Sequence, residues 1–218
     1  MNLSRPLVCV VTRARGGPGS AERASLIGRL ASAAAAGASM IQIRERQLDD
    51  RAVLDFAREL IRATSGSACL VTINDRTDLA IAAGAAGVHL KSGAVSGADV
   101  RKVAPPGFIV GRSVHSVEEA AGVEREGACD YLFFGTVFPS SSKPADHPIA
   151  GVDLLREVCA RVSLPVVAIG GITPFRAPAV AAAGAGGAAA ISFFAEARDT
   201  AEAVASLRGA LTGYPGRV

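Results

Sequence analysis

Apolar segments typical of β-strands alternate along the whole chain with alanine-rich amphipathic segments typical of α-helices. The expected strands are residues 7–12, 40–44, 69–74, 87–90, 109–113, 131–135, 165–170 and 187–192. The expected helices are residues 22–36, 49–64, 77–83, 96–103, 116–126, 152–162, 174–183 and 199–211. Strict alternation predicts a parallel sheet, and eight such units favour a closed (β/α)8 TIM barrel over an open doubly wound sheet. The open sheet is also disfavoured because no Gly-x-Gly-x-x-Gly sequence follows the first strand.

A single barrel accounts for the length and composition of the chain. The sequence has 218 residues, of which 50% are hydrophobic, and this fits one domain spanning residues 1–218. The formal net charge is +3, and the basic residues are scattered, whereas nucleic-acid binding usually needs a concentrated basic face. Residues 1–6 are too short and polar for a signal peptide, and no apolar run approaches the thickness of a bilayer. We therefore expect a cytoplasmic protein without nucleic-acid or membrane partners.

The cysteines do not indicate a zinc site or a disulfide framework. Cys9, Cys69, Cys129 and Cys159 lie far apart in the sequence, with no paired spacing. We expect them to be small core residues in a reducing compartment. The alanine-rich helices are compatible with packing against a second copy of the chain, but core packing explains them equally well.

Two neighbouring strand ends carry small residues suited to anion binding. Residues 168–172 read Ala-Ile-Gly-Gly-Ile, and residues 189–193 read Ala-Ala-Ile-Ser-Phe one βα unit later. The main-chain N–H groups at such junctions can converge on one anion, and this part of a (β/α)8 barrel commonly holds a phosphate. The expected phosphate-binding residues are Gly170, Gly171, Ser192 and Phe193.

Polar side chains follow the second, third and fourth strands, where a barrel places its active site. Gln42, Arg44 and Arg46 share one strand face, opposite Ile41 and Ile43. We expect the isoleucines to face the helices and the polar groups to face the barrel mouth, where a ligand or an internal salt bridge would satisfy them. Further candidate substrate contacts at these strand ends are Asn74 and Lys91.

The fifth and sixth strands lead into segments that can supply a proton carrier and an anion clamp. Ser113 and His115 share one face, and an imidazole in the mouth can exchange a proton near neutral pH, although it could instead fix the loop by a hydrogen bond. The following long loop carries Ser140, Ser142 and Lys143, a pattern that can close over an anionic ligand. We expect all of these residues to contact substrate, with His115 as the catalytic residue.

Six segments together resemble the thiamine phosphate synthase and thiazole tautomerase (TenI-like) superfamily. They are Gln-Ile-Arg-Glu-Arg at 42–46, Ile-Asn-Asp-Arg at 73–76, Gly-Val-His-Leu at 87–90, Gly-Arg-Ser-Val-His-Ser at 111–116, Phe-Gly-Thr-Val-Phe-Pro at 134–139, and 168–172. The match covers nearly the whole chain in order and spacing. The resemblance implies a (β/α)8 barrel that binds thiazole phosphate. In this superfamily the synthase joins a pyrimidine pyrophosphate to thiazole phosphate with magnesium, whereas the tautomerase aromatises a thiazole carboxylate phosphate without metal.

Some residues resemble the tautomerase branch more closely than the synthase branch. In the synthase, one magnesium-binding aspartate matches Asp75, but the other lies five residues beyond the histidine of the fourth-strand motif, where this chain has Ala94. Losing one carboxylate weakens a pyrophosphate-dependent magnesium site. Residues 91–93, Lys-Ser-Gly, also resemble the short tautomerase loop. In contrast, Asn74 with Asp75 and the hydroxyl groups of the long loop with Lys143 resemble the synthase.

We therefore expect a thiazole tautomerase-like isomerase that needs no cofactor. In this interpretation His115 moves the proton, and Arg44, Lys91 or Lys143 holds the substrate carboxylate. The first alternative is a thiamine phosphate synthase, with Asp75 as a magnesium ligand. In that case Asn74 and Ser113 would surround the pyrimidine, and the long loop would hold the pyrophosphate. The second alternative is a protein that binds thiazole phosphate or thiamine phosphate without turnover.

Overall fold

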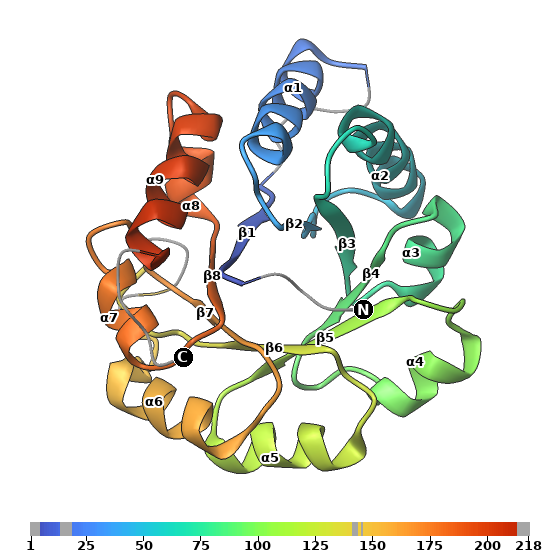
Figure 1. Ribbon diagram of the computed structural model, residues 1–218. Helices are drawn as coiled ribbons and strands as arrows, with labels where there is room; N and C mark the ends of the chain where they lie inside the picture. Colours follow the sequence, from blue (N-terminus) through green and yellow to red (C-terminus); the bar gives the residue numbers. More distant parts are fainter. Residues whose placement is uncertain (1–4, 14–18, 141–143, 145, 213–218) are drawn as a thin grey trace.

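The protein is a closed barrel of eight parallel strands surrounded by helices, in the order β1 to β8, as expected for a (β/α)8 TIM barrel (Figure 1). The computed structural model describes residues 5–13, 19–140, 144 and 146–212. The strands are β1 Leu7–Val11, β2 Met40–Ile43, β3 Leu70–Asn74, β4 Gly87–Leu90, β5 Ile109–Val114, β6 Tyr131–Phe134, β7 Val166–Ile169 and β8 Gly187–Ala190. The helices are α1 Ala21–Ala35, α2 Asp50–Thr64, α3 Thr77–Ala83, α4 Gly97–Val103, α5 Val117–Glu126, α6 Gly151–Arg161, α7 Ala177–Ala182, α8 Ser192–Ala195 and α9 Thr200–Thr212.

Alternate residues of each strand supply two separate cores. Ile41 and Ile43 belong to the large core between the strands and the helices. Met40 instead packs inside the barrel with Ile109 and Tyr131. Burying one such aliphatic side chain contributes roughly 1.5–3 kcal/mol. Because successive side chains point to opposite faces, Gln42 shares the interior face of Met40, as the sequence pattern predicts.

The last βα unit differs from its predicted form. The strand was expected to continue to residue 192, but β8 ends at Ala190 and the short helix α8 begins at Ser192. The apolar run through residue 194 is typical of a strand, yet the chain turns at Ile191, and the Ala195 amide donates to the Ile191 carbonyl. Phe194 is buried in the core between strands and helices, and this contact explains why an apolar segment leaves the sheet.

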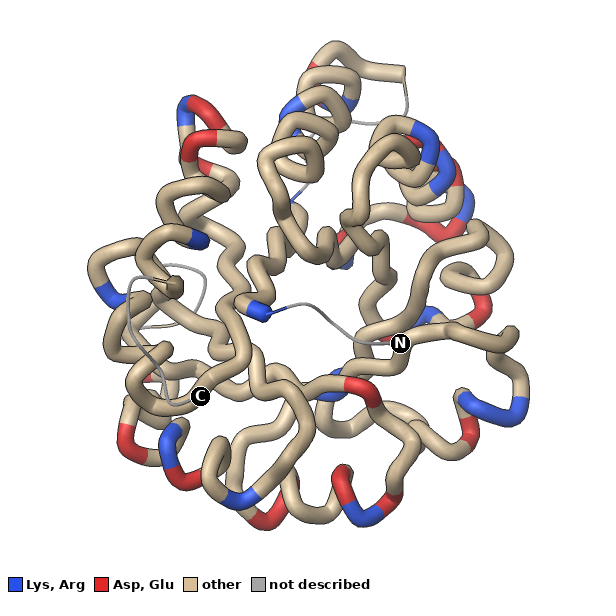
Figure 2. The backbone as a smooth tube through the Cα atoms, in the orientation of Figure 1, with Lys and Arg blue, Asp and Glu red and all other residues tan. Residues whose placement is uncertain are grey.

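Glycines mark the ends of several helices. Gly37, Gly84 and Gly184 follow α1, α3 and α7, and all have positive φ, the conformation that favours glycine after a helix. The four cysteines are free, and Cys9 and Cys129 are buried as expected, whereas Cys69 and Cys159 are only partly buried at the edge of the core. Figure 2 shows Lys and Arg interspersed with Asp and Glu around the outer helices. Within the described part of the chain, every helix is too short or too polar to cross a bilayer.

Candidate active site

A cavity of about 580 Å³ opens at the carboxyl ends of the strands. This volume suits a small organic ligand. The cavity brings together many of the residues predicted from the sequence, namely Gln42, Arg44, Asn74, Ser113, His115, Ser140, Gly170, Gly171, Ser192 and Phe193. Strand ends far apart in the sequence therefore converge on one site.

The Gly170–Gly171 turn forms one wall of the cavity. Gly170 has φ +103° and Gly171 has φ +61°, which L side chains rarely adopt. The turn also lies against the loop after β6, where the Phe138 amide donates to the Gly170 carbonyl at 3.1 Å. A Cβ atom on Gly171 would lie 2.3 Å from the Pro139 carbonyl oxygen. Glycine is required here both by conformation and by the close approach of the neighbouring loop.

The start of α8 lies on the same side of the cavity. β7 and β8 are hydrogen-bonded neighbours, so their carboxyl ends lie side by side. Ser192 and Phe193 are the first residues of α8, and both line the cavity. The N–H groups at the start of a helix point toward its N-terminal end, where they can face an anionic ligand. The turn after β7 and the first turn of α8 are therefore two sources of main-chain donors at one wall.

Arg176 lines the cavity and was not predicted from the sequence. Its Nη1 donates to the Gly171 carbonyl at 2.7 Å and more weakly to the Pro139 carbonyl at 3.4 Å. The guanidinium also lies over the Phe138 ring, 5.0 Å from the centroid. Arg176 therefore joins the glycine turn to the loop after β6. The sequence signal that could have identified Arg176 is a basic residue shortly after the predicted anion-binding turn.

Replacing Arg176 with glutamine is expected to weaken binding of inorganic phosphate about tenfold or more. The variant loses hydrogen bonds from a charged donor, each worth about 1.5–3 kcal/mol, and the turn loses its tie to the neighbouring loop. Isothermal titration calorimetry measures the change. Arg156→Gln is the matched control, since Arg156 forms an ion pair with exposed Asp153 on α6 and does not line the cavity. Equal affinity in the two variants would contradict this role for Arg176.

The opposite wall carries an amide pair and an arginine. The Gln42 Nε2 donates to the Asn74 Oδ1 at 3.0 Å, and Gln42 is buried. The Arg44 amide donates to the Thr12 hydroxyl at 3.1 Å, which fixes the backbone at the end of β2. Burial lowers the pKa of the Arg44 guanidinium, and nearby Arg46 acts in the same direction. A partly desolvated cation at a cavity mouth attracts an anionic ligand.

His89 forms a buried hydrogen-bonded chain beneath the cavity. Its Nε2 lies 2.9 Å from the Ser113 hydroxyl, and its Nδ1 lies 3.1 Å from the Tyr131 hydroxyl. Both ring nitrogens of this buried histidine therefore have hydrogen-bond partners. Burial lowers the pKa of His89 to about 3, so its ring is neutral at ordinary pH. The histidine therefore fixes the Ser113 side chain at the cavity floor.

The pKa of His89 makes stability depend on pH. In the unfolded chain this histidine binds a proton near its ordinary pKa of 6.5, whereas in the folded protein it does so only near pH 3. Between these values the unfolded chain holds more protons, so the free energy of unfolding falls as the pH falls, by up to about 1.4 kcal/mol per unit. Urea unfolding at a series of pH values measures this slope. His89→Gln should flatten it between pH 6 and 4, and an unchanged slope would contradict the assignment.

His115 lies at the cavity mouth and is exposed. Its Nδ1 lies 2.7 Å from the Gly135 carbonyl oxygen, so Nδ1 carries the hydrogen and donates. The His115 amide donates to the Glu119 carboxylate at 2.8 Å. The structure therefore contains the loop-fixing hydrogen bond that was the alternative to a catalytic role, and it also places the ring at the mouth.

Several predicted residues do not line the cavity. They are Arg46, Asp75 and Lys91, while Ser142 and Lys143 lie outside the described residues. An aspartate shortly before a helix often caps it, but the residue at the cap position of α3 is Arg76. The Asp75 carboxylate instead accepts from the Lys91 amide at 2.7 Å and pairs with the Lys91 ammonium at 3.1 Å.

The residues around Asp75 do not match a magnesium site with two protein carboxylates. Magnesium prefers several oxygen ligands in octahedral geometry. Both Asp75 oxygens already contact Lys91, and Ala94 packs its methyl group against the hydrophobic core. Among the described residues, there is no group of three or more His, Cys, Asp or Glu side chains that could hold a metal. The residues that follow β3 and β4 therefore do not fit the magnesium ion that the resemblance to the synthase implies.

The chain is similar to proteins with named activities. The family described as thiamine monophosphate synthase matches residues 8–194. Thiamine-phosphate synthase of Methanocella arvoryzae is 44% identical over 182 residues, which cover 84% of this chain and 85% of that protein. Thiamine-phosphate synthase of Chlorobium luteolum is 37% identical over 202 residues, covering 93% and 91%. The structure of thiamine phosphate pyrophosphorylase from Pyrococcus furiosus has a TM-score of 0.83 and 32% identity, covering 96% and 97%.

These relatives contradict the expectation of a metal-independent thiazole tautomerase, an isomerase. The two curated relatives described above match this chain over most of their length, and both are named thiamine-phosphate synthase. The expectation depended strongly on residues 91–94 in the loop between β4 and α4. Surface loops vary more than the elements that they connect, so a few loop residues do not identify the reaction.

Proposed function

Because the chain belongs to the thiamine monophosphate synthase family, we propose that it is a thiamine-phosphate synthase. This enzyme is a transferase that joins a pyrimidine pyrophosphate to thiazole phosphate and releases pyrophosphate. The proposal is supported chiefly by one feature of the cavity. Main-chain donors at the ends of β7 and β8 face a polar wall formed by the ends of β2 to β5, so one cavity has room for two reactants.

The two walls suggest where each reactant binds. The thiazole phosphate would place its phosphate against the Gly170–Gly171 turn and the first turn of α8. The pyrimidine would contact Asn74 and Ser113, whose orientations depend on Gln42 and His89. Hydrogen-bonded partners that hold these side chains in place reduce the cost of orienting the substrate.

The reaction transfers negative charge to the departing pyrophosphate. A bond forms between the thiazole nitrogen and the pyrimidine methylene carbon, and the bond from that carbon to the pyrophosphate oxygen breaks. The oxygen leaves with the bonding electron pair, so cations near it stabilise the transition state. Arg44 lines the cavity on the side of Asn74 and is one such cation. His115 lies at the mouth, where its ring can help to exclude water from the reacting groups.

The proposal is tested by incubating the purified protein with the pyrimidine pyrophosphate and thiazole phosphate. We expect thiamine phosphate and pyrophosphate to form in equal amounts. Chromatography measures the first product, and a coupled phosphate assay after pyrophosphatase treatment measures the second. Saturable binding of thiazole phosphate without either product would contradict the proposed activity.

A further inference from the structure

We propose that Lys91 provides the positive charge that binds the pyrophosphate group at the ends of β3 and β4, in place of a divalent cation held by the protein. This inference rests on the proposed synthase function, because it concerns the pyrophosphate of that reaction. It predicts that the chain binds pyrophosphate equally well with and without magnesium.

The first observation that supports the proposal is the set of contacts that Asp75 makes. This residue follows Asn74 of β3 directly and has φ +60°, unusual for a residue other than glycine. Its amide donates to the His89 carbonyl at 2.8 Å, which ties the end of β3 to β4. One carboxylate oxygen accepts from the Lys91 amide and the other contacts the Lys91 ammonium. The charge of this carboxylate is therefore already paired with a lysine, which weakens its attraction for a metal ion.

The second observation that supports the proposal is the sum of the charges at the ends of β3 and β4. A magnesium ion held by two carboxylates has a total charge of zero, and so does one carboxylate paired with one ammonium. In this chain Ala94 is packed against the core and supplies no charge, while Lys91 supplies the cation. The Lys91 side chain is 66% exposed, whereas the Asp75 side chain is 20% exposed. The ammonium is therefore the accessible end of the pair, and its remaining donors can bind phosphate oxygens.

The loop that carries Lys91 is held in place by Arg112 of β5. The Arg112 guanidinium donates to the Ser92 carbonyl at 2.7 Å and to the Val95 carbonyl at 2.8 Å. These contacts lie on both sides of Ala94. A lysine on a fixed loop loses less conformational entropy when it binds an anion than one on a loose loop.

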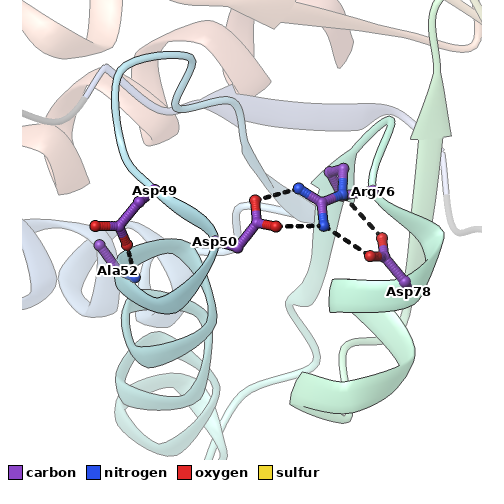
Figure 3. Close-up of polar contacts among 5 residues, drawn as sticks. All are labelled: Asp49, Asp50, Ala52, Arg76 and Asp78. Atoms are coloured by element: carbon purple, nitrogen blue, oxygen red, sulfur yellow. Dashed lines mark hydrogen bonds and ion pairs between the residues drawn. The ribbon is translucent and has the colours of Figure 1, made fainter.

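Arg76, the residue after Asp75, forms its ion pairs with other carboxylates. Figure 3 shows the Arg76 guanidinium between the carboxylates of Asp50 and Asp78. Its Nη2 donates to Asp50 at 2.9 Å and to Asp78 at 2.7 Å. These two carboxylates already pair with Arg76 and more than offset its single positive charge, with Asp78 as the larger cause of its raised pKa. Within the described part of the chain, Lys91 is thus the side-chain cation in direct contact with Asp75.

The pair is also coupled to the cavity. Asn74 and His89, whose strands end beside Asp75 and Lys91, both line the cavity. Burial lowers the pKa of Arg44, and the carboxylates of Glu45 and Asp75 partly offset that effect, as expected for charges close to the cavity mouth. An anion in contact with both Arg44 and Lys91 would span the rim between β2 and β4.

Titration calorimetry with inorganic pyrophosphate tests the proposal without requiring turnover. For the wild-type protein, we expect affinities in EDTA and in magnesium to agree within about threefold. Lys91→Met should weaken binding about tenfold or more, as for the loss of a charge-assisted contact, and Lys91→Arg should retain most of it. Lys102→Met is the control, because it also removes an exposed ammonium from an ion pair, here with Asp99 of α4. It should bind pyrophosphate like the wild type.

A gain-of-function variant completes the experiment. Lys91→Gly combined with Ala94→Asp provides two carboxylates and no lysine, and we expect it to bind pyrophosphate only when magnesium is present. Thermal unfolding checks that each variant is folded. The proposal is overturned if EDTA weakens wild-type binding tenfold, if the wild type binds no pyrophosphate in either buffer, or if folded Lys91→Met binds normally. Failure of the synthase assay alone, with this binding pattern intact, would reject the reaction and retain the lysine site.

Discussion

Gly171→Ala is expected to lower kcat/KM for thiazole phosphate by about 100-fold, because the substitution displaces the turn that would bind the phosphate. The new Cβ would lie 2.3 Å from the Pro139 carbonyl oxygen and 2.8 Å from the Arg176 Nη1. The positive φ of 61° adds backbone strain. The turn must therefore move by a substantial fraction of an ångström, and misplacement of about 1 Å is enough for an effect of this size.

Steady-state kinetics with each substrate varied in turn measures this effect. We expect the loss to follow thiazole phosphate, with weaker binding of inorganic phosphate in calorimetry. Gly122→Ala is the matched control, since Gly122 lies in α5 and a Cβ there meets only the Arg125 Nη2 at 3.9 Å. If folded Gly171→Ala retains near wild-type kcat/KM, this turn does not bind the phosphate.

Gly111→Ala is expected to lower the free energy of unfolding by about 3 kcal/mol, at the upper end of the usual overpacking range. Gly111 lies in β5 beside Tyr131, and an added Cβ would lie 2.1 Å from the Tyr131 Cζ and 2.4 Å from its hydroxyl oxygen. Tyr131 is completely buried, with its ring against His89 and Phe133. The ring cannot move outward without displacing these neighbours, so the barrel interior must expand.

Urea unfolding followed by circular dichroism measures this change. The same substitution at Gly122, within a helix and without a close neighbour, should be neutral or stabilising by about 0.5–1 kcal/mol. The comparison separates overpacking from the general effect of replacing glycine. A loss below about 1 kcal/mol at Gly111 would mean that the interior tolerates the extra methyl group.

The barrel could be predicted because its pattern repeats along the chain and each strand shows it independently. Ile41 and Ile43 alternate with Gln42, and two-residue periodicity alone places them on opposite faces. The start of α8 was not predictable in this way, since the segment Ile191 to Phe194, apolar except for Ser192, suits a strand equally well. Only the burial of Phe194 against the core distinguishes the two.

The expectation of a parallel sheet was enough to predict that the strand ends converge on one cavity. It was not enough to predict which side chains contact each other there. Asp75 contacts Lys91 because β3 pairs with β4 in a register that matches Asn74 with His89. A sequence shows neither this register nor the positive φ of Asp75. Arg176 was missed for a related reason, because its acceptors, the carbonyls of Gly171 and Pro139, belong to segments that come together only in the folded barrel.

The chain of Tyr131, His89 and Ser113 has a consequence for ligand preference. A neutral imidazole carries one hydrogen, so one ring nitrogen donates while the other accepts. If the Tyr131 hydroxyl donates to Nδ1, Nε2 donates to Ser113, and the serine hydroxyl can offer its hydrogen to a ligand acceptor. If Nδ1 donates instead, Ser113 gives its hydrogen to the ring and presents only lone pairs to the ligand. A tyrosine enclosed in the barrel thus selects, through tautomerism, which polarity of ligand atom the serine recognises.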